Sequence, residues 1–259
     1  MAEPIYLWKD TAPYSEQSPE QAQPSILPYI VEGSRGAVIV LAGGGYFKKT
    51  AYEAFPVAEA IAEMGVSAFV LDYRIKPCDK MAPSTDTSRA IRYVRSMGFE
   101  KVAILGFSAG GNAVCTAATH YDFGNPDSSD PIERYSSRPD LFIPCYAVTS
   151  LIAHTHAGSV RNLLGDQSSS SEWLKYFSAE YNITRDTPPA FIWHCVDDPA
   201  VPVECALELA KQLSLKGIKY ELHLFPDGGH GLGLANDNPS VRQWQTLLGQ
   251  YLLLNGYSK

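Results

Sequence analysis

Ser108 lies in the segment Gly106-Phe107-Ser108-Ala109-Gly110, between two apolar runs. A serine hydroxyl is a weak nucleophile unless a neighbouring base removes its proton. The spacing G-x-S-x-G is typical of a sharp strand-to-helix turn, on which the serine backbone is strained and bulky neighbours would clash. A helix that starts here would direct its free N–H groups at the serine and favour negative charge beside it. The segment therefore predicts a nucleophile for acyl transfer, and the alternative is an idle serine in a glycine-rich turn.

The base for this serine is predicted to be His230. It lies in the loop "LFPDGGHGLGL", and the glycines let this loop carry an imidazole back over the edge of a sheet. His194 and His223 fall inside predicted strands, where structural roles are expected. His154 and His156 have an H-x-H spacing that could bind a metal ion, but no third ligand is near them in the sequence. For this pair a surface position is favoured.

The third member of a catalytic triad should follow a strand between the serine and the histidine. Asp197 and Asp198 both follow the predicted strand at 190–196. Asp198 is favoured because it opens a proline-shaped turn into the next helix, and Asp197 is interpreted as a solvated loop carboxylate. The resulting order, Ser108, Asp198 and His230, is the order of the α/β-hydrolases and differs from both protease orders.

Stabilising an acyl-transfer intermediate also requires N–H groups that bind its negative oxygen. Ala109 follows the nucleophile and offers one N–H, and the loop "LAGGGYF" after the strand at 36–42 offers the second. Gly44 is assigned as this donor, with Gly45 as a further candidate. Tyr46 follows directly and is predicted to narrow the space for the acyl group. This predicts a preference for acyl chains from acetyl to butyryl, because one steric clash offsets the gain from burying several methylenes.

Short apolar runs alternate with longer helical patterns along the chain. Strands are expected at 36–42, 66–71, 101–106, 141–147, 190–196 and 219–225, and helices at 52–64, after Pro83, at 108–120, 203–216 and 240–254. This order predicts an α/β fold with a mostly parallel central sheet and helices on both faces. Residues 1–259 are expected to form a single domain. Its N-terminal arm, residues 1–35, is irregular or β-edged, and a variable, cap-like insertion covers about 121–180.

Composition excludes several other classes of protein. The net charge of −7 and the absence of a basic stripe predict no nucleic-acid binding. Five widely spaced cysteines without a C-x-x-C pair predict neither a disulfide framework nor a zinc site, and favour the cytoplasm. No signal peptide and no membrane span is visible. The predicted chemistry needs no cofactor or metal, its partner is a small-molecule ester, and both a monomer and a homo-oligomer fit the sequence.

Longer segments carry a resemblance to a known family. "AVIVLAGGGY", "VSAFVLDYRI", "AIRYVRSMGFEKVAILGFSAGGNAV", "DTPPAFIWHCVDDPAVPVECALELAKQL", "YELHLFPDGGHGLGL" and the opening "IYLWKDTAP" resemble the α/β-hydrolase esterases related to acetyl-xylan and feruloyl esterases. The resemblance covers most of the chain and weakens across about 121–180. It implies a serine carboxylesterase for short-chain acyl esters, such as acetylated sugars or plant-polysaccharide esters. Ala42 departs from the histidine that many relatives in the wider lipase group have before the three glycines, so the support of this loop is expected to differ.

Other functions stay open at this level. A serine peptidase or amidase of the same fold would use the same triad, and a non-catalytic hydrolase-like binding protein would lack one of its members. Trp173, Tyr176 and Phe177 in the insertion could stack on a sugar or a phenolic group, or could form the core of a small cap.

Overall fold

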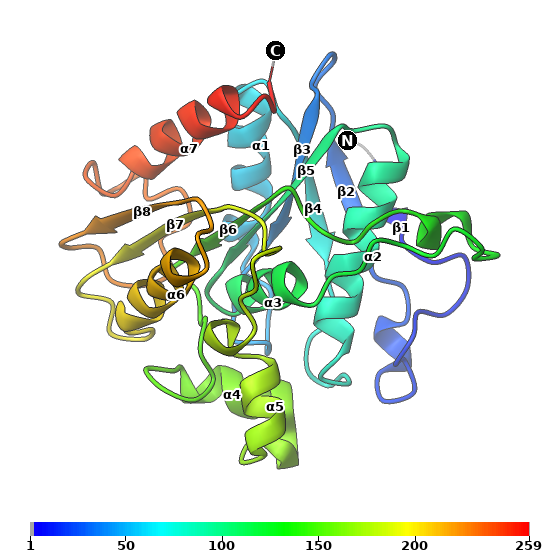
Figure 1. Ribbon diagram of the computed structural model, residues 1–259, viewed down its shortest axis with the longest axis horizontal. Coiled ribbons are helices and arrows are strands. Elements are labelled where there is room, and N and C mark those ends of the chain that lie inside the picture. The colour runs from blue at the N-terminus through cyan, green and yellow to red at the C-terminus, as the bar shows by residue number, and fades with distance from the viewer. Residues whose placement is uncertain (1–2, 259) are drawn as a thin grey trace.

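The fold is built around one β-sheet that is mixed and mostly parallel (Figure 1). The computed structural model describes residues 3–258, and within them eight strands lie in the order β1-β2-β4-β3-β5-β6-β7-β8. The strands are β1 (Ile5–Tyr6), β2 (Ser25–Tyr29), β3 (Gly36–Leu41), β4 (Ser67–Asp72), β5 (Lys101–Phe107), β6 (Leu141–Cys145), β7 (Ala190–Cys195) and β8 (Tyr220–Phe225). The β1–β2 and β2–β4 pairs are antiparallel, and all other pairs are parallel. The carboxyl ends of β3 to β8 therefore lie at one edge of the sheet.

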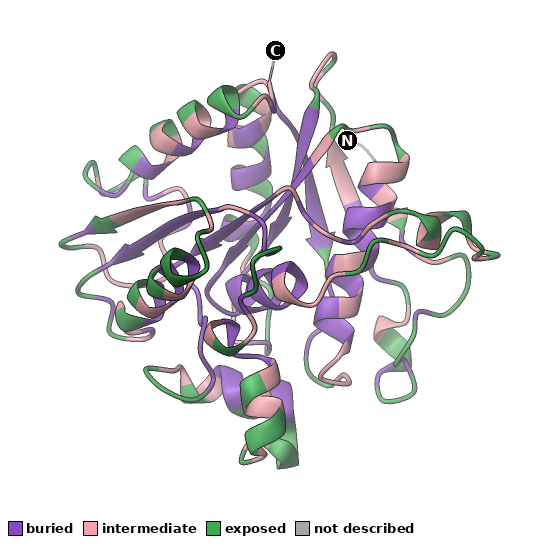
Figure 2. Ribbon diagram, viewed as in Figure 1, coloured by how far each residue is buried: buried purple, intermediate pink, exposed green. Residues whose placement is uncertain are grey.

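Helices cover both faces of this sheet, as Figures 1 and 2 show. Helices α1 (Phe55–Glu63) and α7 (Gln243–Leu254) pack into one apolar cluster, and α2 (Ala82–Ser96), α3 (Ser108–Thr119) and α6 (Glu204–Leu215) pack into the other. Strands β3, β5 and β7 are almost entirely apolar, apart from Lys101 at the start of β5 and His194 in β7, as expected for strands with both faces buried. The predicted α/β-hydrolase architecture is confirmed.

One predicted helix is divided into two elements. The expected helix at 52–64 consists of a 3₁₀ turn, η2 (Ala51–Glu53), and then α1 from Phe55. Pro56 has no N–H to give to a preceding turn, so it is tolerated only at the start of the α-helix. As a result Glu53 lies in a tight turn, with its side chain buried.

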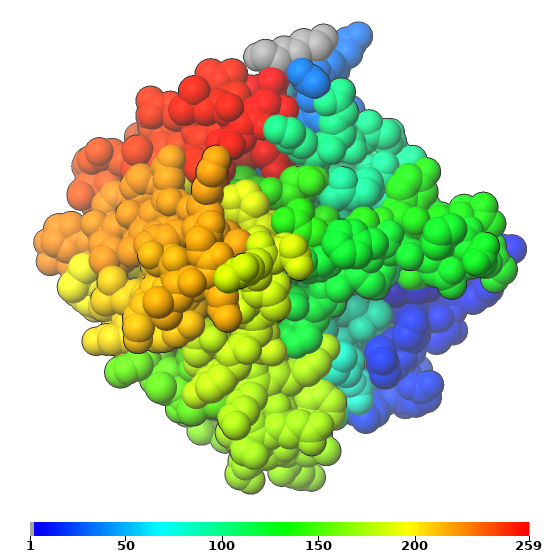
Figure 3. Space-filling view, viewed as in Figure 1, coloured from blue at the N-terminus to red at the C-terminus, as the bar shows by residue number. Residues whose placement is uncertain are grey.

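The predicted insertion at about 121–180 is two separate excursions, because β6 runs through it. Residues 121–140, which include η3 (Pro131–Arg134), pack against α2, where Arg89 pairs with Asp130 and with Glu133 at 2.7 Å each. The second excursion lies between β6 and β7 and contains α4 (Ala157–Leu164), η4 (Gly165–Gln167), α5 (Ser171–Tyr176) and η5 (Ala179–Tyr181). Figure 3 shows the two excursions projecting on different sides of the molecule.

None of the helices in residues 3–258 combines the length and the apolar composition needed to cross a bilayer.

Candidate active site

The turn between β5 and α3 has the strained geometry that its glycine spacing predicts. Ser108 has φ +52°, in the left-handed region, and its residue surface is 6% exposed. A Cβ at Gly106 would lie 2.4 Å from the carbonyl oxygen of Gly110, and a Cβ at Gly110 would lie 2.5 Å from that of Ala42. Contacts this short with backbone cannot be relieved by a side-chain rotation. Both glycines are therefore required, and the turn holds backbone strain of about 1–3 kcal/mol at the serine.

The structure brings Ser108, His230 and Asp198 together, although 122 residues separate the first two. The Nε2 atom of His230 lies 2.9 Å from Oγ of Ser108, and its Nδ1 atom lies 2.6 Å from Oδ2 of Asp198. Each residue follows the carboxyl end of a parallel strand: β5 for the serine, β7 for the aspartate and β8 for the histidine. Because the carboxylate accepts from Nδ1–H, Nε2 is left to accept the serine proton.

Asp198 is fixed from several directions. Its Oδ1 accepts the N–H groups of Ala200 at 2.8 Å and Val201 at 2.9 Å, while Oδ2 lies 3.3 Å from Nε2 of His194. Burial by itself would raise the pKa of Asp198, but hydrogen bonds from His194, from His230 and from the Val201 N–H together hold the pKa below its ordinary value. The carboxylate therefore stays ionised and oriented toward His230. His194 is buried and its Nε2 lies 2.8 Å from the Val201 carbonyl oxygen, so it supports this turn.

Asp197 is exposed, as interpreted from the sequence, but it is not idle. Its Oδ1 accepts the N–H groups of Gly228 at 2.9 Å and Gly229 at 2.8 Å. The Gly229 N–H, followed by that of Gly228, lowers the pKa of Asp197. Asp197 thus holds the start of the loop that carries His230, while the neighbouring Asp198 contacts the imidazole.

The loop after β3 is held so that one of its N–H groups stays unpaired. The Gly43 carbonyl oxygen accepts the Thr50 N–H at 3.1 Å and the Thr50 hydroxyl at 3.2 Å. In a trans peptide the next N–H points the opposite way, so the Gly44 N–H points away from Thr50. Gly44 has φ +125°, and a Cβ there would lie 2.2 Å from the Lys48 carbonyl oxygen, so only glycine fits. Ala109 lies in the first turn of α3, where N–H groups have no partner within the helix. In residues 3–258 neither the Gly44, the Gly45 nor the Ala109 N–H donates to another protein group.

Tyr46 does not wall the space for an acyl group, which corrects the prediction from its place in the sequence. It is 2% exposed and its hydroxyl donates to Oδ1 of Asn112 at 2.8 Å. Its ring belongs to the core cluster that α2, α3 and α6 cover. Adjacency to Gly45 in the sequence was misleading because the Tyr46 side chain packs in the core and is bound to α3 through Asn112.

His156 is half-buried and makes contacts that the sequence did not reveal. Its Nδ1 accepts the Ser159 N–H at 3.2 Å and so caps α4, and its Cε1 would be 3.9 Å from a Cβ at Gly45. Burial and then the nearby charge of His230 lower the pKa of His156. His156 therefore lies beside the candidate oxyanion loop, residues 43–45, whereas His154 is exposed.

The aromatic side chains of α5 form the core of the cap. The ring of Trp173 packs on those of Tyr176 and Phe177, with centroids 5.7 and 6.1 Å apart, and all three contact the main core. Of the two alternatives that the sequence left open, these contacts favour the structural one.

Glu53 and Tyr146 are functional candidates that the sequence did not reveal. Oε2 of Glu53 accepts the Gly43 N–H at 2.9 Å, and Oε1 accepts the Tyr146 hydroxyl at 2.6 Å. The Tyr73 hydroxyl donates to the Ala42 carbonyl oxygen at 2.6 Å. These contacts support the glycine loop, which here follows Ala42 and not the histidine that many relatives in the wider lipase group have at this place. No spacing or motif marked Glu53, because it meets its partners only in the folded chain.

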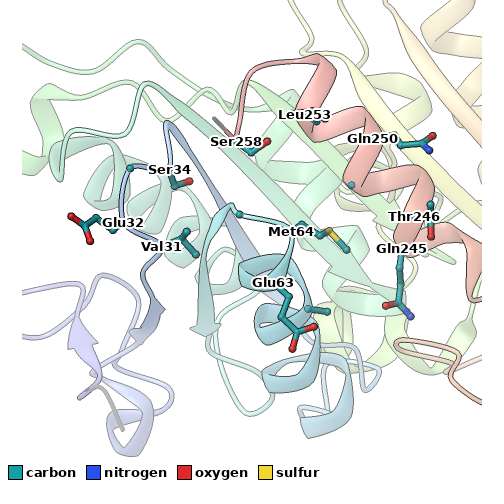
Figure 4. Close-up of a pocket in the computed structure, with 14 residues that line it drawn as sticks. Val31, Glu32, Ser34, Glu63, Met64, Gln245, Thr246, Gln250, Leu253 and Ser258 are labelled. Carbon is teal, nitrogen blue, oxygen red and sulfur yellow. The ribbon is translucent and has the colours of Figure 1, made fainter.

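A cleft of about 660 Å³ lies away from this cluster (Figure 4). It is formed by α1, α7 and the connection from β2 to β3, near the amino ends of the strands. None of the predicted site residues lines it. Across residues 3–258, no three His, Cys, Asp or Glu side chains are grouped in a way that could hold a metal ion.

A serine on a strained strand–helix turn, in contact with a histidine and through it with an aspartate after later strands of one parallel sheet, is the arrangement typical of the α/β-hydrolases. A family model described as BD-FAE matches residues 26–213. The chain belongs to the BD-FAE family.

Known proteins of similar sequence and structure agree with this family. The chain is 35% identical to an endo-1,4-beta-xylanase B of Butyrivibrio fibrisolvens, covering 89% of this chain and 38% of that protein. It is 28% identical to an acetylxylan esterase of Xylanibacter ruminicola, covering 80% of this chain and 43% of that protein. The chain thus spans less than half the length of these two relatives. The crystal structure of an acetyl ester-xyloside bifunctional hydrolase from Caldicellulosiruptor lactoaceticus is 38% identical, with a TM-score of 0.94 over 100% of this chain and 98% of that one.

Proposed function

We propose that this protein is a serine carboxylesterase that removes short acyl groups, acetyl first among them, from carbohydrate esters. The observation that carries the proposal is the chain of contacts from Ser108 through His230 to Asp198, with separations of 2.9 and 2.6 Å. Family membership supports an ester as the substrate. The names of the relatives, which refer to xylan, to acetylxylan and to an acetyl ester-xyloside, support an acetylated xylose-based sugar as the alcohol part of that ester.

In the proposed mechanism Ser108 Oγ attacks the ester carbonyl carbon while His230 Nε2 takes the hydroxyl proton. The N–H groups of Gly44 and Ala109, with Gly45 as a further donor, bind the oxygen that becomes negative. Collapse of the tetrahedral intermediate breaks the bond to the alcohol, which leaves with the proton from His230. Water then attacks the acyl-enzyme with His230 as base, and the carboxylic acid is released. Asp198 holds the imidazole in the required tautomer and stabilises its protonated form.

The test compares substrates that separate the candidate activities. We expect hydrolysis of p-nitrophenyl acetate and release of acetate from acetylated xylo-oligosaccharides. We also expect covalent labelling of Ser108 by a fluorophosphonate. Faster cleavage of a peptide amide would favour a peptidase, and failure to label would favour a non-catalytic binding protein. Methyl ferulate, assayed beside the acetates, tests whether a phenolic acyl group is accepted.

We also propose a cytoplasmic location. All five cysteines are free thiols, four of them buried, and a reducing compartment keeps such thiols reduced. Fractionation of the producing cell tests this, and recovery from the culture medium or the periplasm would contradict it.

A further inference from the structure

Glu53 is a buried carboxyl group that the mechanism above does not use. It is 2% exposed, lies on η2, and each of its oxygens accepts one hydrogen bond: Oε2 from the Gly43 N–H and Oε1 from the Tyr146 hydroxyl. Burial raises the pKa of Glu53 above its ordinary value, and the hydrogen bonds from Tyr146 and Gly43, the nearby His230 and the Thr50 hydroxyl only partly offset this rise. Two donors on two oxygens are the arrangement that an ionised carboxylate satisfies.

Tyr146 continues the connection toward the catalytic base. Its oxygen accepts the Gly233 N–H at 3.0 Å, three residues beyond His230. Its ring lies edge-on to the imidazole of His230, with centroids 4.9 Å apart. Tyr146 has φ +35°, an uncommon value for a non-glycine residue, and it directly follows β6. One series of hydrogen bonds therefore runs from the oxyanion loop through Glu53 and Tyr146 to the loop that carries the base.

We propose that Glu53 is a positioning residue that fixes the oxyanion loop and the His230 loop relative to each other. Its negative charge also favours the protonated form of His230 during acyl transfer. This rests on the proposed function. In the same step the substrate carbonyl oxygen, bound by the Gly44 N–H, becomes negative and His230 becomes positive. Groups fixed before the step need no reorganisation while these charges develop. Glu53 contacts the oxyanion loop directly and the His230 loop through Tyr146, so it can fix the groups that stabilise the negative and the positive charge.

The titratable groups that interact with His230 include Asp198, His156 and Glu53, and their effects can be separated by mutation. Asp198 contacts it from the β7–α6 connection, His156 lies before α4, and Glu53 lies behind Tyr146. Asp197 is exposed and bound to the N–H groups of Gly228 and Gly229. Glu53 and Asp197 do not touch the imidazole, and of this pair only Glu53 is buried.

The experiment replaces Glu53 by glutamine, which keeps the shape and removes the charge. Glu59→Gln, on the exposed side of α1, is the matched control. Both are compared with wild type by kcat and KM on p-nitrophenyl acetate across pH, by the rate of fluorophosphonate labelling, and by Tm. We expect Glu53→Gln to lower kcat about 10- to 100-fold, below the roughly 10²–10³-fold cost of losing an oxyanion donor outright, with KM little changed.

The pH profile separates this role from a merely structural one. Without the carboxylate the imidazolium is less favoured, so the acid limb of kcat/KM should move to lower pH by about half a unit or more. Glu59→Gln should leave kcat and the acid limb unchanged. A wild-type kcat in Glu53→Gln, or a loss of kcat with an unmoved acid limb, would overturn the proposal.

Tyr146→Phe keeps the test decisive if Glu53→Gln does not fold. It retains the ring beside His230 and removes only the hydroxyl that joins Glu53 to Gly233. We expect a fall in kcat without a change in KM. Because the hydroxyl also helps to lower the pKa of Glu53, the acid limb should shift in the same direction as in Glu53→Gln and by no more. An unchanged kcat in this variant would contradict the connection between the loops. A wild-type protein that neither labels nor hydrolyses any ester would instead refute the proposed function itself.

Discussion

The turn at 106–110 and the segment 146–182 meet at Ser108, where the Val148 N–H donates to the serine carbonyl oxygen at 3.1 Å, but they are held in different ways. The turn is fixed by backbone contacts in which even a Cβ would not fit. The segment is fixed by side chains that reach across the fold. Nδ2 of Asn112 donates to the carbonyl oxygens of Val148 and Phe177 at 2.9 Å each. Asn162 of α4 donates to the Gly45 carbonyl oxygen at 2.9 Å.

The difference suggests separate roles: the turn at 106–110 sets the rate of the reaction, and the segment 146–182 adapts the site to its substrate. A nucleophile must be placed to within a fraction of an ångström, and a sterically determined turn provides that placement. A segment held by a few long-range side-chain bonds can change its length and sequence while those bonds are kept. We therefore expect the largest effects of mutation at the turn and the triad, and smaller, substrate-dependent effects in the segment.

The largest expected effect is that of Ser108→Ala. Removing the nucleophile should lower kcat by roughly 10⁴–10⁶, as in triad variants of other serine hydrolases. The melting temperature should stay close to that of wild type, because the alanine keeps the backbone and the small volume of the side chain. Steady-state kinetics and calorimetry check both points, and retained activity would show that the turn does not carry the nucleophile.

The adjacent aspartates should differ by orders of magnitude. Asp198→Asn should lower kcat by about 10⁴, the loss found for the corresponding change in a serine protease, because the imidazole loses the carboxylate that fixes its tautomer. Asp197→Asn should cost far less, since an amide oxygen can still accept the N–H groups of Gly228 and Gly229. Parallel kcat measurements decide the assignment, and a reversed order would transfer the catalytic role to Asp197.

His156 tests the segment itself. Its Nδ1 is occupied by the cap of α4, so Nε2–H is an available donor beside the oxyanion loop. If this N–H binds the substrate, its loss in His156→Ala should lower kcat/KM by up to about tenfold. This corresponds to one hydrogen bond, which contributes about 0.5–1.5 kcal/mol. The exposed His154→Ala is the control, and equal kcat/KM values for the two variants would remove His156 from the site.

The smallest effect on activity is expected for Tyr46→Phe. The variant leaves the buried Oδ1 of Asn112 without its donor, which should lower the free energy of unfolding by about 1–3 kcal/mol. Because the ring faces the core, the preference among acetyl, butyryl and longer esters should not move. Denaturant unfolding and a chain-length series measure the two quantities, and a shift toward longer acyl groups would restore Tyr46 to the substrate pocket.

The strands, most of the helices and the contacts within the triad could be predicted because their signals are local. Apolar runs bounded by glycine and proline mark buried parallel strands, and a residue that follows such a strand comes to the same edge as the others. The prediction for Tyr46 was wrong because it depended on where a side chain points. Tyr46 directly follows Gly45 but is 2% exposed and belongs to the core. Nor did the sequence indicate that His156 lies beside Gly45.

Three features can be derived from the amino-acid sequence alone: the α/β order of elements, the glycines that a strained serine requires, and the order of serine, aspartate and histidine along the chain. These follow from periodicity and from steric limits within a few residues. The folded chain confirms that Asp198 rather than Asp197 contacts His230. It alone shows that Tyr46 is buried, and that Glu53 binds the Gly43 N–H directly and reaches Gly233 through Tyr146. The direction of a side chain and the partner of a buried carboxylate depend on segments tens of residues apart, which meet only when the sheet and its helices are packed.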